Sequence, residues 1–381
     1  MSQTLNEHFA LQQPAMLEAL CEVVEMESPS TDKLLVDALG TRIAQRFGDL
    51  GARITVHPQE RVGDHLEIVV DASGAPTSAR PVLVLCHYDT VWSAGTLASR
   101  PFAIPDGRLS GPGVFDMKSG LVMLEFSLRA IRALGLPLPR PIVVLINSDE
   151  EIGSHTSRPL IERQALDAQH TLVLESPLAG GMLKTARKGV GGYRVQVEGR
   201  AAHAGLDPEK GISAVSELAR LVPMIHALNN PLAETTLNVG VIRGGTRPNV
   251  VAAQAEAEVD VRVWTLAEAD RINQAMLALR PANPGARVSV SGGLNRPPME
   301  RSAATATLFE RAQTLALALG QELTEGAAGG GSDGNFTAAL GVPTLDGLGA
   351  LGDGAHAAHE YILPESLAPR AALLTALLTG L

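Results

Sequence analysis

The sequence predicts an α/β protein in which a mixed, largely parallel sheet lies between layers of helices, with a smaller α+β domain inserted into the chain. Two observations predict this fold. Up to about residue 189, buried apolar runs of strand length alternate with amphipathic helical segments, which is typical of a sheet with parallel strands. Beyond it the order becomes strand, helix, strand, strand, helix, strand, which is that of a ferredoxin-like domain. We therefore expect a discontinuous first domain, residues 1–189 and 297–381, and an inserted domain, residues 190–296.

The composition excludes several classes of function. A chain of 381 residues fits two domains better than one core, and its formal charge of −10, without a Lys/Arg-rich block, disfavours nucleic acid or an anionic membrane as a partner. Cys21 and Cys86 are the only cysteines, which rules out a disulfide scaffold and a cysteine-built zinc finger. The sequence contains no signal-peptide pattern and no run of 18 apolar residues. We expect a soluble, cytoplasmic protein that acts on a small molecule.

Apolar periodicity predicts the elements of the first half in chain order. Helices are expected over 14–27 and from a cap at 30–32 to about 50, strands over 53–56 and 66–70, a turn over 73–78, a buried strand from 82 to 87, a helix over 118–134, and buried strands over 141–147 and 170–174.

The inserted domain and the return to the first domain have their own periodicity. The expected elements are strands over 191–198, 236–242, 253–263 and 286–291, helices over 211–228, 266–279 and 304–319, a glycine-rich loop over 329–334 and a strand over 342–345.

Side chains that can bind a metal follow three of the buried strands. Ligands of open α/β sheets bind beyond the carboxyl ends of the strands. A surface turn, a helix N-cap or a solvated acidic loop could explain any one of these side chains, but their repetition at strand ends favours a common site. Histidines and carboxylates without thiolates suit Zn²⁺ or a related divalent ion. The residues are His87 and Asp89 after the first strand, Glu150 and Glu151 after the second, Glu175 after the third, and Asp116 in a glycine-rich loop between them.

Seven motifs in order give the chain a resemblance to a known superfamily. They are H-Y-D-T at 87–90, G-x-F-D-M-K at 113–118, D-E-E-I-G at 149–153, Glu175, G-R-A-A-H-A-G at 199–205, G-G-T-x-x-N at 244–249 and H-x-x-x-E at 356–360. With these motifs the chain resembles the co-catalytic zinc exopeptidases of the aminoacylase, acetylornithine deacetylase and glutamate carboxypeptidase superfamily, and it is most similar to the folate-hydrolysing glutamate carboxypeptidases. The resemblance covers nearly the whole chain.

The resemblance implies a centre of two zinc ions per subunit, for which Co²⁺ or Mn²⁺ could substitute. Asp116 would bridge the ions, His87 and Glu175 would complete one site, and Glu151 and His356 the other. Glu150 would be the general base and Asp89 would orient His87. His359 is the alternative to His356, but the spacing of four residues from histidine to glutamate selects His356.

The resemblance also implies a role for the inserted domain as a lid and dimerisation domain of a homodimer. His203 would stabilise the oxyanion, in this superfamily often from the partner subunit. Five residues, Asn249, Arg262, Gly330, Gly331 and Ser332, would hold the terminal carboxylate of the substrate. Taken alone, His203 would be read as a capped surface histidine, Arg262 as a salt-bridged strand residue and the glycine run as a turn.

The implied activity is hydrolysis of an amide bond that releases a C-terminal amino acid, with glutamate as the leading candidate, from an N-acyl or folate-like substrate. Glu175 favours the carboxypeptidase, aminoacylase and deacetylase branches, because dipeptidases and tripeptidases tend to have aspartate there. The alternative is an N-acyl-amino-acid deacylase of the acetylornithine or acetylcitrulline type. A non-catalytic binding homologue is less consistent with the sequence, since every expected ligand and the base are present.

Overall fold

The computed structural model describes residues 2–73 and 79–381, which divide into two compact units. Unit 1 contains the chain up to 186 together with 301–328 and 332–381, and unit 2 contains 187–300 and 329–331. Most of the predicted turn over 73–78 lies outside the described residues. No helix in the described part of the chain is both long and apolar enough to cross a membrane.

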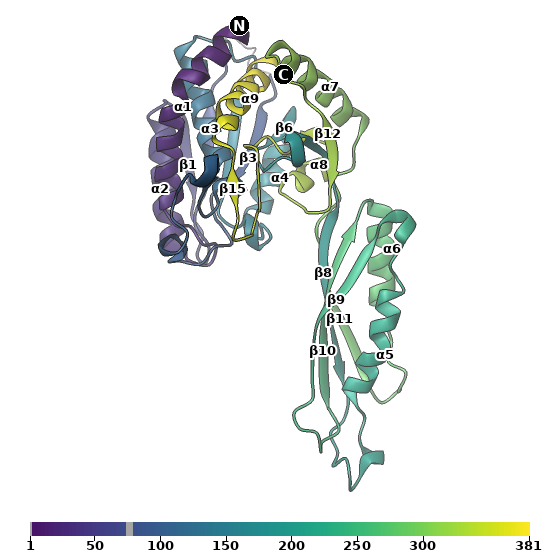
Figure 1. Cartoon of the computed structure of the whole chain (residues 1–381). Helices are drawn as coiled ribbons and strands as arrows, with labels where there is room; N and C mark the ends of the chain where they lie inside the picture. Colours follow the sequence, from purple (N-terminus) through teal and green to yellow (C-terminus); the bar gives the residue numbers. More distant parts are fainter. Residues whose placement is uncertain (1, 74–78) are drawn as a thin grey trace. The chain divides into compact units, whose positions relative to one another are not determined.

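Unit 1, in which Figure 1 labels β1, β3 and β6, is built on a six-stranded sheet. The strand order is β1-β2-β5-β3-β6-β13. The strands are β1 (Arg53–His57), β2 (His65–Val70), β3 (Val82–His87), β5 (Ile142–Asn147), β6 (His170–Val173) and β13 (Thr344–Leu345). β5, β3, β6 and β13 are mutually parallel, whereas β1 and β2 run antiparallel to their neighbours. This confirms the predicted mixed, largely parallel sheet.

Helices cover both faces of this sheet. The helices of unit 1 are α1 (Ser2–Glu25), α2 (Lys33–Gly48), α3 (Ser119–Ala133), α4 (Arg158–Asp167), α7 (Ala303–Ala318), α8 (Gly334–Ala339) and α9 (Leu367–Gly380). Short strands complete the unit: β4 (Leu109–Ser110), β7 (Leu183–Arg187), β12 (Glu325–Ala328), β14 (Gly352–Asp353) and β15 (Tyr361–Ile362).

Strand β3 shows why both faces need a cover. All six of its residues are buried, and successive side chains of a strand point to opposite faces. Val84 and Cys86 join the core formed with α1, α2, α3, α7 and α9, whereas Leu83 and Leu85 join a second core formed with α4 and α8. A buried strand of this kind carries few polar side chains before its last residue, so its chemistry is confined to the carboxyl end.

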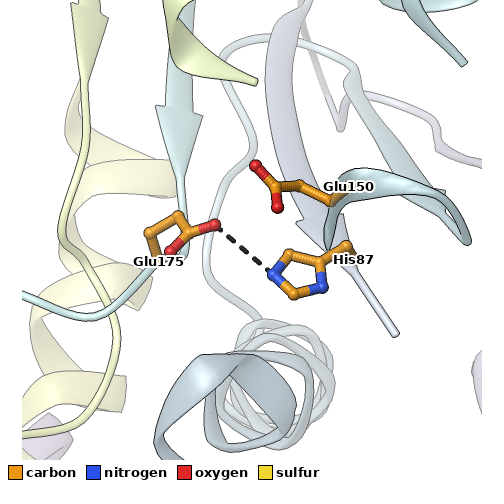
Figure 2. A group of neighbouring side chains, drawn as sticks. All are labelled: His87, Glu150 and Glu175. Carbon is orange, nitrogen blue, oxygen red and sulfur yellow. Dashed lines mark ion pairs between the residues drawn. The ribbon is translucent and has the colours of Figure 1, made fainter. Parts of the chain in front are cut away.

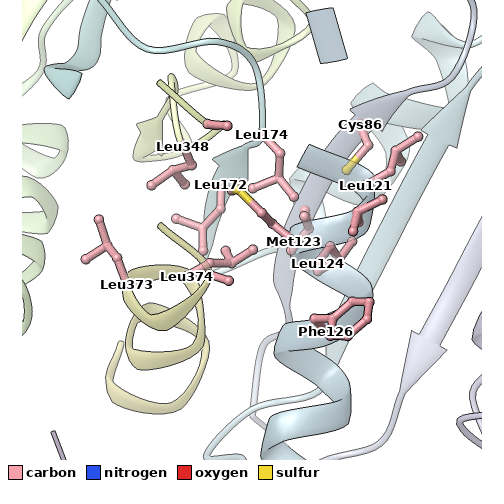
Figure 3. Packing of buried hydrophobic residues seen from close by; sticks show 14 of the residues in the cluster. Cys86, Leu121, Met123, Leu124, Phe126, Leu172, Leu174, Leu348, Leu373 and Leu374 are labelled. Atoms are coloured by element: carbon pink, nitrogen blue, oxygen red, sulfur yellow. The ribbon is translucent and has the colours of Figure 1, made fainter. Parts of the chain in front are cut away.

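The larger core packs α3 against the sheet and α9 (Figure 3). In Figure 3, Leu121 of α3 lies beside Cys86 of β3, and Met123 of α3 lies beside Leu172 and Leu174 from β6 and its extension. Gly120 allows the closest approach, because a Cβ atom at this position would lie 2.5 Å from the backbone oxygen of Leu174. The residue after Leu174 is Glu175, so the packing of α3 against Leu174 helps to fix the backbone next to a predicted site residue.

The prediction for the start of the first helix was wrong. Helix α1 begins at Ser2 and includes Pro14, where the sequence suggested a helix that starts at the proline. Leu5 and Phe9, both buried, extend the apolar stripe of Met16 and Leu20 by about three turns. Burial of this stripe in the core outweighs the backbone hydrogen bond that proline cannot donate.

Unit 2 contains a four-stranded antiparallel sheet in the order β11-β8-β10-β9, with two helices. Its elements are β8 (Gly189–Glu198), α5 (Ala214–His226), β9 (Thr236–Gly244), β10 (Gln254–Val263), α6 (Leu266–Leu277) and β11 (Arg287–Arg296). Alternate residues of β8 and β10 are buried, and they form a separate core with α5 and α6. This strand order is that of a ferredoxin-like domain.

We expect Gly120→Ala to destabilise unit 1, although alanine is the better helix former. The added methyl group would press on the Leu174 carbonyl, and overpacking of this kind costs about 1–3 kcal/mol. Gly48→Ala is the matched control, because nothing lies within 4 Å of a Cβ atom at that helical glycine. Urea unfolding followed by circular dichroism measures both. Equal stability of the two variants would show that α3 can move away from β6 without cost.

Candidate metal centre and active site

Three neighbouring parallel strands bring the predicted site residues to one edge of the sheet. His87 is the last residue of β3 and lies opposite Asn147, the last residue of β5. Glu150 and Glu151 follow β5 in a short 3-10 turn, and Glu175 follows β6 on the other side of β3. Figure 2 shows the side chains of His87, Glu150 and Glu175 turned toward one another. The strand order β5-β3-β6 therefore creates the cluster.

The carboxylate of Asp116 lies between two histidines. Its Oδ1 atom is 3.3 Å from His87 Nε2, and its Oδ2 atom is 3.2 Å from His356 Nε2. His87 Nε2 is also 3.4 Å from Glu175 Oε1, and His356 Nε2 is 3.0 Å from Glu151 Oε2. The structure thus brings together all five side chains for which the sequence predicted metal binding, with one oxygen of Asp116 facing each histidine.

Candidate ligand atoms in this cluster are close enough to share an ion. One oxygen of Glu150, one of Glu175 and a ring nitrogen of His87 lie within 4.8 Å of one another, and the same holds for His87, Asp116 and Glu151. Glu151 Oε1 is buried and has no hydrogen-bond partner among the described residues. A buried carboxylate oxygen without a partner is costly, and a divalent cation would satisfy it. The residues present therefore fit a metal centre.

His87 is oriented by the segment that follows it. Its Nδ1 atom lies 3.0 Å from the backbone oxygen of Asp89 and 3.4 Å from the Oδ1 atom of that residue, so Nε2 is left to face Asp116. The Asp89 carboxylate, fully buried, also accepts hydrogen bonds from Ser30 Oγ and from the backbone N–H groups of Glu150 and Glu151. Asp89 thus holds the turn with the two glutamates as well as the imidazole.

The close approach of buried charges shifts the pKa values of this cluster. Burial raises the pKa of Glu151 to about 8. Hydrogen bonds with Asp116 and then with Glu151 raise the pKa of His356 to about 11. Burial, followed by the charge of Asp116, also raises the pKa of Glu175. The protons that Glu151 and His356 retain at neutral pH replace the positive charge that a metal ion would supply.

His359 faces elsewhere. It lines a separate open cavity of about 690 Å³ with Arg100, Arg108 and Tyr361, and it makes no hydrogen bond or ion pair with the residues that the structure describes. His356 has a positive φ of 62°, and this turn directs its side chain to Asp116.

The site residues predicted in unit 2 have separate local environments. His203 is exposed, and its Nδ1 atom accepts backbone hydrogen bonds from Gly205 and Leu206, each at 3.1 Å. Arg262 forms two hydrogen bonds of 3.0 Å with the carboxylate of its strand neighbour Asp260. Asn249 is exposed, and its backbone oxygen accepts a hydrogen bond from Ala204.

The glycine-rich loop has partners that the sequence did not reveal. Arg187 donates to the backbone oxygens of Gly330 and Gly331, and a Cβ atom at Gly331 would lie 2.8 Å from Cδ of Arg296. Ser332 is buried and its Oγ donates to Asp346. No motif marks Arg187 or Arg296, because each contacts the loop only through the tertiary fold.

Glu360 is the other residue whose position the sequence did not predict. The motif named it only as the end of the H-x-x-x-E spacing. In the structure its carboxylate is fully buried beneath the loop that carries Asp116. The only feature of the sequence that pointed to Glu360 was its position at the end of this motif.

Comparison with known proteins finds one family and many relatives. Residues 83–380 match the model described as Peptidase family M20/M25/M40. Carboxypeptidase G2 of Pseudomonas sp. (strain RS-16) is 28% identical over 365 residues, which cover 94% of this chain and 87% of that protein.

Solved structures share the fold at lower identity. An M20 family metallo-carboxypeptidase, Sso-CP2 from Sulfolobus solfataricus, has a TM-score of 0.74 at 16% identity and covers 96% of this chain and 98% of its own. Aminopeptidase PepT from Bacillus cereus ATCC 10987 has a TM-score of 0.78 at 23% identity, with 97% and 98% covered.

We expect zinc binding to release protons at pH 7 and to tighten as the pH rises from 6 to 9. Below their raised pKa values Glu151 and His356 hold protons, and both bind metal only after losing them. The affinity should rise about tenfold per pH unit for each proton released. Calorimetric titration in two buffers with different ionisation enthalpies measures the release.

Two histidine variants are the matched pair for this experiment. His356→Ala should bind one zinc ion fewer and release fewer protons, whereas His359→Ala should behave like the wild type. Binding heats that do not depend on the buffer, or the reverse order of the two variants, would contradict the assignment.

Proposed function

The chain belongs to peptidase family M20/M25/M40, and from this membership we propose that it is a two-zinc metallo-carboxypeptidase that releases a C-terminal amino acid, glutamate, from an N-acyl or folate-like substrate. One observation carries the proposal: the Asp116 carboxylate lies between His87 and His356, with each histidine next to a second acidic side chain.

The proposed centre has two sites that share Asp116. His87 and Glu175 complete the first, and Glu151 and His356 complete the second. Two zinc ions bound there would polarise the scissile carbonyl and lower the pKa of the attacking water molecule. The protein's contribution is to fix the ligands, and Asp89 does so on one side by holding both His87 and the glutamate turn.

Glu150 is the proposed general base. It stands in the same turn as Glu151, and in Figure 2 its carboxylate faces the space between Glu175 and His87. From there it takes a proton from the attacking water and gives it to the nitrogen of the leaving amine as the amide bond breaks. The turn is held by Asp89 through the N–H group of Glu150 itself, which keeps the base in place.

His203 is the proposed oxyanion donor. Because Nδ1 accepts two backbone hydrogen bonds, the neutral ring carries its proton on Nε2. This tautomer is the one that can donate to an oxyanion without a prior proton transfer. We propose that His203 acts from the inserted domain, either within one subunit or across a homodimer.

The proposed carboxylate site combines Asn249 and Arg262 with the loop residues Gly330, Gly331 and Ser332. Arg262 would have to exchange Asp260 for the substrate, since the two are paired in the free protein. A planar guanidinium binds a carboxylate through two parallel hydrogen bonds, in a bidentate manner, so a substrate carboxylate can replace the carboxylate of Asp260. Arg187 and Arg296 bring two further guanidinium groups to the same loop.

Two observations support the glutamate carboxypeptidase branch. Glu175 stands at the position where dipeptidase and tripeptidase branches tend to have aspartate, and carboxypeptidase G2 is similar to this chain over nearly its whole length.

We expect the zinc-loaded chain to release glutamate from N-acyl-glutamate and folate-like substrates faster than it deacylates acetylornithine or acetylcitrulline. Glu150→Gln should lose nearly all turnover and keep its zinc, because only proton transfer is removed. Glu151→Gln should also lose metal. The assay pairs amino-acid release over this panel with zinc content by elemental analysis. A preference for the acetylated substrates would favour the deacylase alternative, and equal metal loss in both variants would contradict the choice of base.

We expect His203→Ala to lower kcat by about a hundredfold or more, the typical loss for one oxyanion donor, without change in zinc content or fold. Mixing Glu150→Gln subunits with His203→Ala subunits tests whether the histidine acts across a dimer. If they exchange and activity returns, His203 is supplied by the partner. If they exchange and the mixture stays inactive, it acts within its own subunit.

A further inference from the structure

Glu360, the last residue of the H-x-x-x-E motif, has no role in the proposed chemistry, yet its carboxylate lies at the centre of a buried hydrogen-bond cluster. It is fully buried. It accepts four hydrogen bonds, which come from Gly113 N at 3.0 Å, Phe115 N at 2.9 Å, Asp116 N at 3.2 Å and Trp92 Nε1 at 2.9 Å.

Three of these donors belong to the backbone of the loop that carries Asp116. Gly113 has a positive φ of 72°, and the loop turns there so that its N–H groups point to one side. A buried N–H group without an acceptor costs free energy, so the Glu360 carboxylate stabilises this loop conformation over others. Because one of the three N–H groups is that of Asp116 itself, the same contact limits the rotation of the backbone from which its carboxylate extends.

Glu360 is in turn held by Trp92 and Arg100. The Arg100 guanidinium stacks on the Trp92 ring at 4.1 Å, and its Nη2 atom is 4.0 Å from Glu360 Oε2. Both terminal nitrogens of Arg100 are buried and make no hydrogen bond with the described residues. Arg100 therefore acts on the Glu360 carboxylate through its charge, whereas Trp92 holds the carboxylate by a direct hydrogen bond from its indole N–H group.

We propose that Glu360 is a positioning residue: through the N–H groups of Gly113, Phe115 and Asp116 it sets the Asp116 carboxylate in the orientation that binds two metal ions. The inference rests on the proposed function in that Asp116 is taken as the bridging ligand. It goes further by assigning the control of that ligand to a residue that binds neither metal nor substrate. A purely structural role, in which Glu360 only joins two loops, would leave metal affinity unchanged in a folded variant.

The test is zinc affinity of the full chain, measured by competition with a chelating indicator after metal removal. In Glu360→Gln the NH2 group of the amide, which is a donor, would replace one of the two acceptor oxygens and face N–H groups that are also donors. We expect the zinc affinity of at least one site to fall ten- to a hundredfold. The absorption spectrum of the Co²⁺-loaded variant should also change, because the geometry at Asp116 is altered. Glu365→Gln is the control, since it removes the same charge from an exposed position five residues away.

Trp92→Phe keeps the test decisive if Glu360→Gln does not fold. It removes one of the four hydrogen bonds and keeps the aromatic ring under Arg100, so we expect a severalfold loss of zinc affinity. Wild-type affinity and an unchanged Co²⁺ spectrum in folded Glu360→Gln, or in Trp92→Phe if the former does not fold, would overturn the positioning role alone. A wild-type chain that binds no metal would refute the proposed centre and this inference with it.

Discussion

The mutual repulsion of buried carboxylates is the constraint on which the rest of this structure depends. Asp116, Glu151 and Glu175 lie at one edge of a sheet, and burial alone would favour their neutral forms. Glu151 and Glu175 are there because β5 and β6 run parallel to β3 on either side of it and end at the same edge, and the loop before α3 brings Asp116 to them. Without metal the cluster balances its charge with His87 and His356 and with retained protons, an arrangement that divalent cations would replace.

Fixing charged groups at the ends of strands requires ordered loops, and other buried acids provide that order. Asp89 accepts the N–H groups of the glutamate turn, and Asp149 accepts Thr156 N at 2.7 Å and Ser157 Oγ at 2.6 Å in the segment behind it. Glu360 does the same for the loop of Asp116. Hydrogen bonds from backbone to carboxylate are charge-assisted and short-ranged, so they can hold irregular backbone where no strand or helix does.

In unit 2, local hydrogen bonds also fix the side chains of predicted site residues. The acceptor role of His203 Nδ1 is set by two neighbouring N–H groups, and the resulting tautomer follows from local backbone geometry alone. Arg262, by contrast, has a partner in Asp260 because alternate residues of a strand share one face. Its predicted contact with a substrate therefore competes with an interaction that the free protein already makes.

The sequence by itself determined the elements of the fold and the residue types of the candidate site. Apolar runs of strand length and period-two alternation are local properties, so the buried strands, the ferredoxin-like order and the presence of His87 and Glu175 at strand ends could be read from it. Only the tertiary structure decided what depends on contacts between distant segments. The extension of α1 to Ser2 follows from burial in a shared core. Motif spacing had selected His356, but its contact with Asp116 depends on a turn that the sequence does not specify. The place of Glu360 beneath Asp116 joins residues 244 positions apart. The sequence of a loop has no periodic pattern from which the direction of a side chain could be predicted. That direction is fixed by the residues with which the fold brings the side chain into contact.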